Sequence, residues 1–192
     1  MHTLARATVG PNSREPLMRL NRRLAASTAA LALAAAGLVL GTGTAHAASC
    51  SQSYLPLQDA ACQPGALNSA VTQSTINSTI CVSGYSSSIR PSTSYTNALK
   101  VQQIAEYGYS DTSTADYEED HLIPLSLGGA PKSAQNLWPE PRYDVGGYAA
   151  TDKDTVEYKL YKAVCAGTIK LAPAQNAIAT DWTTALQAVG PS

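Results

Sequence analysis

The sequence predicts a small single domain of the α+β class, and three observations lead to this prediction. Apolar residues recur at helical spacing in one segment near the middle of the chain and in two segments near its end. Two short strand-like segments lie between them, separated by a loop with glycine and proline. The 192 residues suffice for one ordinary domain, and they contain no internal repeat. The order helix, strand, loop, strand, helix, helix is typical of an α+β domain.

The segment 1–47 has the composition of a secretory signal peptide. Arg14, Arg19, Arg22 and Arg23 precede an apolar run at 24–40, and small residues lead to Ala-His-Ala at 45–47, a sequence that suits signal peptidase. The run is too short and too rich in small residues for a good membrane span, so we expect no permanent membrane anchor. Cleavage after Ala47 predicts a secreted, extracellular protein.

The predicted cleavage changes the net charge of the chain. The leader holds five of the 13 basic residues and one of the 14 acidic residues. Eight basic and 13 acidic residues remain, a net charge of about −5, which argues against indiscriminate binding to nucleic acid. This net charge does not exclude nucleic-acid binding through a local basic groove or through a phosphate bridged by a metal ion.

All four cysteines follow the predicted cleavage site, and an even number in an exported chain predicts disulfides. Three connectivities are possible, and proximity favours Cys50–Cys62, which leaves Cys81–Cys165 as a long-range link. Zinc binding is the poorer alternative, because the chain has no C-x-x-C pair and little histidine.

The elements are expected in the following order. Residues 48–75 are rich in serine, glutamine, alanine and threonine, which predicts a poorly ordered segment before a domain at 76–190. Thr96 is a candidate N-cap for a helix at about 97–107. A strand at 117–122 runs into an apolar loop with turn signals, and a second short strand follows at 136–138.

Two helices complete the expected domain. The first begins near Thr151 or Asp152 and ends at Ala166-Gly167, with acidic residues in its first turn. The last begins at Pro173 and carries a buried stripe of every fourth residue: Ala174, Ile178, Trp182 and Leu186. Both tryptophans are expected in the core. The ten tyrosines would offer stacking surfaces for bases or, more simply, cover the surface of the domain.

The chemistry-bearing residues cluster at the end of the first strand. His121 is the only histidine that remains after removal of the leader, and no G-x-S-x-G motif is present. Asp120 precedes it directly, and Glu118 lies two residues earlier, on the same side of a strand. A solvated acidic loop is the simple interpretation. The acids run straight into an apolar segment, however, and a carboxylate at a core edge needs a partner such as a hard divalent cation.

The stretch Asp120-His121-Leu-Ile-Pro-Leu-Ser-Leu-Gly-Gly, followed by Asn136-Leu137, resembles the HNH (ββα-metal) endonuclease pattern. The resemblance covers about 117–165. It implies an HNH-like core, which we expect to be flanked by helices and braced by the disulfides, in a monomeric protein. It also implies one divalent metal ion, Mg²⁺ or Mn²⁺, and hydrolysis of nucleic-acid phosphodiester bonds, with DNA favoured over RNA.

The resemblance also implies roles for individual residues. His121 matches the general base that deprotonates the attacking water, Asp120 the metal-binding acid, and Asn136 the residue that orients the loop carrying the histidine. The family's helix-borne histidine is missing. Asp154 or Glu157 would supply the second metal ligand, or either is simply an acid favoured at a helix start.

The family's paired C-x-x-C zinc knuckles are also missing, and the disulfides would replace their bracing. Arg90 is a candidate phosphate contact, with a surface salt bridge as the simpler role. The alternative function is a non-catalytic secreted binding or structural module that retains the fold.

Overall fold

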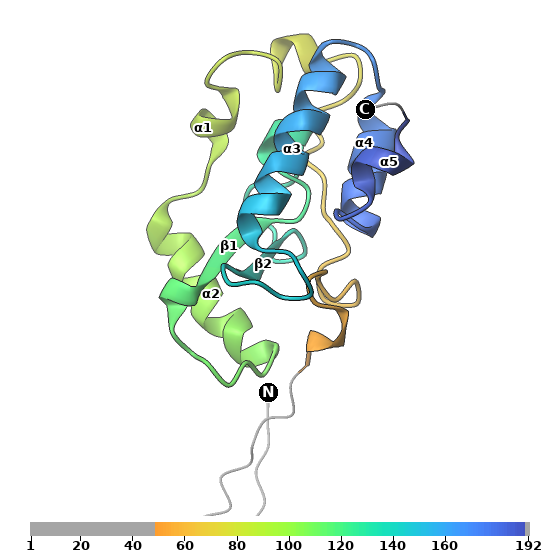
Figure 1. The fold of residues 1–192 in the computed structure, drawn as a ribbon. Coiled ribbons are helices and arrows are strands. Elements are labelled where there is room, and N and C mark those ends of the chain that lie inside the picture. Colours follow the sequence, from red (N-terminus) through yellow and green to blue (C-terminus); the bar gives the residue numbers. More distant parts are fainter. Residues whose placement is uncertain (1–48, 191–192) are drawn as a thin grey trace, which may run out of the picture. The chain divides into compact units, whose positions relative to one another are not determined.

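A computed structural model describes residues 49–190, which hold five α-helices and one pair of β-strands (Figure 1). The predicted signal peptide and its cleavage site lie outside these residues, as does Ala48, the first residue after the predicted cleavage. The predicted α+β class is confirmed, because a small two-stranded sheet is combined with helices. The elements are α1 (Tyr85–Ile89), α2 (Thr93–Glu106), β1 (Tyr117–His121), β2 (Leu137–Pro141), α3 (Ala150–Cys165), α4 (Leu171–Thr180) and α5 (Ala185–Ala188).

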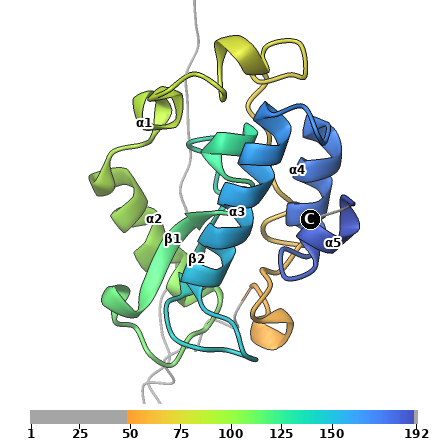
Figure 2. The ribbon, with the colours of Figure 1, turned by 45° about the horizontal axis from the view of Figure 1, so that its top comes forward.

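The two strands are antiparallel, and the register pairs Glu118 with Glu140 and Asp120 with Trp138. The second strand extends three residues beyond the predicted end. It accommodates two prolines because each strand of a two-stranded sheet has a free edge. Both views show the strand pair lying between α2 and α3 (Figures 1 and 2). The candidate residues at the end of β1 therefore lie beside the first turns of α3.

The start of α2 differs from the prediction. Ser92, not Thr96, is the N-cap, and its side chain accepts a hydrogen bond from the backbone N–H of Tyr95. Ser92 follows a proline and has the extended backbone that a cap requires, whereas the Thr96 hydroxyl donates to the carbonyl of Thr93 inside the helix. The helix therefore begins four residues earlier than its apolar pattern indicates.

The predicted last helix is interrupted. It begins at Leu171, so that Pro173 lies in the first turn, and it ends at Thr180. The Asp181 carboxylate accepts hydrogen bonds from the backbone N–H and the hydroxyl of Thr183, a local pattern that competes with helical bonding. The predicted stripe still faces the core, because Ile178 and Trp182 are buried on either side of the break.

Two hydrophobic clusters fill the interior. One joins α3, α4 and α5 through residues such as Leu160, Val164 and Ile178, and includes Trp182. The other joins α2 to the strands and includes Trp138. Its centre is a group of three tyrosines, and for these three the expected surface position is wrong. Tyr107, Tyr109 and Tyr117 are each at most 6% exposed and pack ring to ring.

Both predicted disulfides, Cys50–Cys62 and Cys81–Cys165, are formed. They are typical of an oxidising, extracellular environment. The Cys81–Cys165 bond ties the last residue of α3 to a segment 84 residues earlier, so it braces the helix that lies beside the candidate site. Within residues 49–190, no helix is both long enough and apolar enough to span a membrane.

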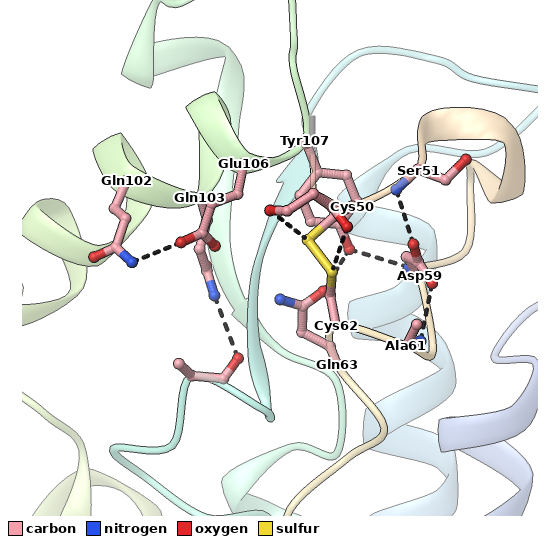
Figure 3. Close-up of a disulfide and its surroundings, with 12 residues drawn as sticks. Cys50, Ser51, Asp59, Ala61, Cys62, Gln63, Gln102, Gln103, Glu106 and Tyr107 are labelled. Carbon is pink, nitrogen blue, oxygen red and sulfur yellow. Dashed lines mark hydrogen bonds between the residues drawn. A yellow bond between two sulfur atoms is a disulfide. The ribbon is translucent and has the colours of Figure 1, made fainter. Parts of the chain in front are cut away.

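The segment before Ile76, predicted to be poorly ordered, lacks long helices and strands but makes specific contacts. Beside the Cys50–Cys62 disulfide, the backbone N–H of Cys50 donates to the Glu106 carbonyl over 2.9 Å (Figure 3). The Tyr107 hydroxyl donates to the Gln63 side chain and accepts from the N–H of Asp59. The disulfide loop is thus fastened to the end of α2.

The same segment also contacts the loop between the strands. The N–H of Gly65 donates to the Gln135 carbonyl over 3.0 Å, and the N–H of Asn68 donates to the Gly128 carbonyl over 2.9 Å. Residues far apart in sequence therefore support the loop that follows the predicted catalytic pair. Composition alone does not indicate such contacts, because they depend on the tertiary fold.

Candidate functional site

The loop between β1 and β2 is held together by Asn136. Its side-chain oxygen accepts from the N–H of Ile123 over 3.0 Å, and its amide nitrogen donates to the carbonyls of Ile123 and Ala130 over 3.0 and 3.2 Å. Asn136 is fully buried, and its side chain takes the place of water as the hydrogen-bond partner of three backbone groups. The amide thus bridges both ends of the loop that begins after His121.

The position of Gly129 requires a glycine, because the returning chain passes close to the backbone of Ile123 at this point. A Cβ atom at this position would lie 1.7 Å from the carbonyl oxygen of Ile123 and 2.6 Å from the Asn136 amide nitrogen. Only glycine lets the returning chain pass at this distance. Two motif residues that are distant in sequence therefore have one joint function, which is to close the loop.

His121 ends β1, is 4% exposed, and has a single assigned ring partner, the Pro131 carbonyl, 3.1 Å from Nε2. A carbonyl only accepts, so Nε2 carries the hydrogen and Nδ1 of the neutral ring keeps its lone pair. Burial lowers the pKa of His121 below its usual 6.5, although the Pro131 carbonyl and Asp120 act in the opposite direction. The ring is therefore neutral at pH 7 and able to accept a proton.

Asp120 is bonded to a lysine of α3. The Lys153 ammonium lies 2.5 Å from Oδ2 of Asp120 and 3.0 Å from the backbone carbonyl of His121, and it also binds Glu157 one helical turn later. Lys153 is only 1% exposed. Burial alone would lower the pKa of Lys153, but Asp120, Glu157 and Glu140 together raise it above its ordinary value, so the side chain stays charged.

Further acids surround this group. Glu140 lies opposite Glu118 in the strand pair, is 3% exposed, and has one carboxylate oxygen without a hydrogen-bond partner. Burial raises the pKa of Glu140 well above its usual range, and Asp120 raises it further. Burial and then Asp120 likewise raise the pKa of Glu118 and of Asp154. The acids therefore outnumber the cations that face them.

This donor set fits a hard divalent cation bound in part by water. Asp120 has one carboxylate oxygen outside its bond to Lys153, and it lies close enough to the exposed Asp154 to raise the pKa of that carboxyl group. Mg²⁺ commonly takes one or two carboxylates and completes its shell with water and phosphate oxygens. Among residues 49–190, no three His, Cys, Asp or Glu side chains converge into a complete metal cage.

A groove of about 360 Å³ opens beside these acids, with α1 on one side and α3 on the other. Asp154, Glu157 and Tyr158 of α3 line it, facing serines that precede and form α1. Arg90, the residue after α1, forms no ion pair with any of residues 49–190, so the salt bridge expected for it is not seen. Its charge contributes to the pKa shifts of His121 and Asp154, which places it near both.

The structure thus brings Asp120, His121 and Asn136 together and places Asp154 and Glu157 of α3 beside Asp120. Sequence reasoning gave no role to Lys153 or Glu140. A lysine between acids on a helix usually indicates a solvated pair with the residue one turn away. The apolar residues Leu160 and Val164, which continue the Lys153–Glu157 face at helical spacing, were the available signal that this face is buried.

The comparisons were made against family models, curated proteins and solved structures, and none of the three gave a match for this chain. The likeness to HNH endonucleases therefore remains a resemblance of motif.

Glu119 provides a prediction about stability that is separate from the candidate chemistry. Both of its carboxylate oxygens are buried without a hydrogen-bond partner. Burial raises the pKa of Glu119 from 4.5 to about 8, with smaller contributions from Asp120 and Glu106 and against the opposing charge of Lys100. Between these two pH values the unfolded chain releases a proton that the folded chain retains, so stability falls as the pH rises from 4.5 towards 8.

Glu119→Gln removes this ionisation at almost constant volume. We expect its gain in the free energy of unfolding over wild type to grow from pH 5 to pH 8, reaching about 2–4 kcal/mol. Urea unfolding at several pH values measures it. Asp116→Asn, which removes an exposed carboxylate just before β1, is the control and should show no comparable trend. A gain for Glu119→Gln that does not change with pH would contradict a buried, protonated Glu119.

Proposed function

We propose that this chain is a secreted, metal-dependent endonuclease of the HNH kind that hydrolyses phosphodiester bonds in nucleic acid, with DNA preferred. The observation that carries the proposal is the placement of His121. Its Nε2 is tied to a loop carbonyl, its Nδ1 keeps a free lone pair, and the metal-binding candidate Asp120 precedes it directly. A neutral, oriented imidazole beside a carboxylate suits the removal of a proton from water.

Each residue has a defined part in the proposed reaction. Nδ1 of His121 accepts the proton of the attacking water, and Asn136 holds the loop whose Pro131 carbonyl fixes the ring. Asp120 and Asp154 would hold the divalent ion, which would supply charge stabilisation for the phosphate and the leaving oxygen. Arg90 lies near both His121 and Asp154 and is the cation that we expect to bind a substrate phosphate.

One observation favours the alternative, a non-catalytic secreted module. Asp120 already has a cationic partner in Lys153, and an acid of this kind stabilises a fold without any bound metal. In that case the same residues would serve structure alone. The two functions differ in whether metal-dependent cleavage occurs.

The deciding experiment incubates the oxidised, exported protein with supercoiled plasmid or with RNA, in Mg²⁺, Mn²⁺ or EDTA. We expect nicking that requires metal, and a loss of roughly 100-fold in rate for Asp120→Asn, since metal-based charge stabilisation contributes several kcal/mol. Asp116→Asn is the matched control because it removes an exposed carboxylate just before β1. A folded wild-type protein that leaves both substrates intact with every metal would establish the non-catalytic alternative.

A further inference from the structure

The Lys153 side chain has an uncommon setting for a lysine. Its ammonium is buried, and its three N–H donors match three acceptors: Asp120 Oδ2, Glu157 Oε1 and the His121 carbonyl. Two of these acceptors are carboxylate oxygens, and a third buried acid, Glu140, has an oxygen without a partner. A single monovalent cation thus lies among three carboxylates from β1, β2 and α3.

Carboxylates arranged in this way need a cation. Without one, Asp120 and Glu157 would be two largely buried acids side by side with no compensating charge, which is unfavourable. Proteins meet the need with an ion, with a basic side chain or by protonating one of the acids. Here the helix supplies the basic side chain from the position one turn before Glu157.

We propose that Lys153 is a built-in cation that fills the inner position between Asp120 and Glu157 and thereby keeps a divalent ion out of it. Glu157 is then a partner of Lys153 and not a metal ligand. Any divalent ion is confined to the outer side of Asp120, where the other carboxylate oxygen and the exposed Asp154 are available.

Lys153 is also a positioning residue under this proposal. The same ammonium that binds Asp120 binds the backbone carbonyl of His121, so it holds the end of β1 against α3. The part of the proposal that concerns the outer ion rests on the proposed function. The part that concerns the inner position does not, because it rests on the burial of Lys153 and its three contacts.

The first test is Lys153→Met, which keeps most of the side-chain length and removes the charge. Thermal unfolding is measured with and without Mn²⁺, and Mn²⁺ binding by calorimetry, on the full oxidised protein. We expect a lower Tm without metal, recovery of that loss on adding Mn²⁺, and at least roughly 10-fold tighter Mn²⁺ binding than wild type, because three acidic oxygen donors replace a bonded ammonium. Lys159→Met, an exposed lysine on the same helix, should change neither quantity.

Glu157→Gln in the presence of Lys153 is the second test, and it decides the matter if Lys153→Met does not fold. We expect its Mn²⁺ affinity to stay within about twofold of wild type, whereas Asp154→Asn weakens binding by roughly 10-fold or more. Equal weakening by Glu157→Gln and Asp154→Asn would overturn the proposal, since it would make Glu157 a ligand. Folded Lys153→Met without any Mn²⁺-dependent recovery would overturn it as well.

The two tests also separate this proposal from the nuclease. A wild-type protein that binds no Mn²⁺ would remove the outer ion and the proposed function. Recovery of Lys153→Met by Mn²⁺ would still support the built-in cation in that case, and its absence would overturn it.

Discussion

His121→Ala is expected to lower the rate of metal-dependent cleavage by roughly 10²–10⁴-fold, the range that a positioned general base contributes. No other histidine follows the predicted cleavage site, Asp120 and Glu157 are bonded to Lys153, and Glu118 is paired with Arg142. The loss should therefore appear in kcat at saturating metal. Addition of metal should not restore the rate, because the ion does not replace the proton acceptor.

The pH dependence of the wild-type rate tests the same assignment. A general base works in its neutral form, and burial keeps the imidazole neutral by lowering its pKa below 6.5. The rate should therefore be unaffected by protonation of His121 at pH 7 and fall only on the acidic side of pH 6.5. A fall that is already complete at pH 7 would contradict a buried, neutral His121.

His121→Gln is the matched control for the structural role of the ring. Its side-chain amide can still donate to the Pro131 carbonyl, but it has no basic nitrogen. If the variant keeps its Tm and loses cleavage, the loss comes from the missing base and not from the fold. If it cleaves at the wild-type rate, His121 is not the general base.

The sequence was sufficient for features that depend on local pattern. The strand–loop–strand–helix order followed from apolar spacing and turn residues, and the disulfides followed from cysteine number and proximity. The break after Thr180 was missed because a stripe of buried residues continues across it. The Asp181 side chain ends the helix by accepting hydrogen bonds within its own turn, and the spacing of apolar residues does not reveal such a bond.

The candidate site was only partly predictable for a different physical reason. Motif positions identified Asp120, His121 and Asn136, but the charge balance around them depends on which face of α3 is buried. Lys153 lies between two aspartates in the sequence, a position that is typical of a solvent-exposed lysine. In the fold it is buried and binds Asp120 of β1. Glu140 lies between two prolines, and only the strand register, which pairs it with Glu118, shows that it is near the candidate site.

Asn136→Ala should have the largest effect on stability, about 3–5 kcal/mol in the free energy of unfolding. The substitution leaves one buried N–H and two buried carbonyls without the partner that now satisfies them, and each such group costs about 1–3 kcal/mol when it cannot reach water. Chemical denaturation measures the change. Asn97→Ala, an exposed asparagine on α2, should change stability by less than about 1 kcal/mol.

The same substitution separates positioning from chemistry at His121. Asn136 contacts the loop at Ile123 and Ala130, and the next residue after Ala130 provides the carbonyl that holds the imidazole. Asn136→Ala, assayed at a temperature where it is fully folded, should therefore cleave more slowly although every proposed catalytic group is present. Full activity in the folded variant would mean that Gly129 and the segment before Ile76 hold the loop without the amide. A large loss would mean that the position of the Pro131 carbonyl, and with it the free lone pair of His121, depends on Asn136.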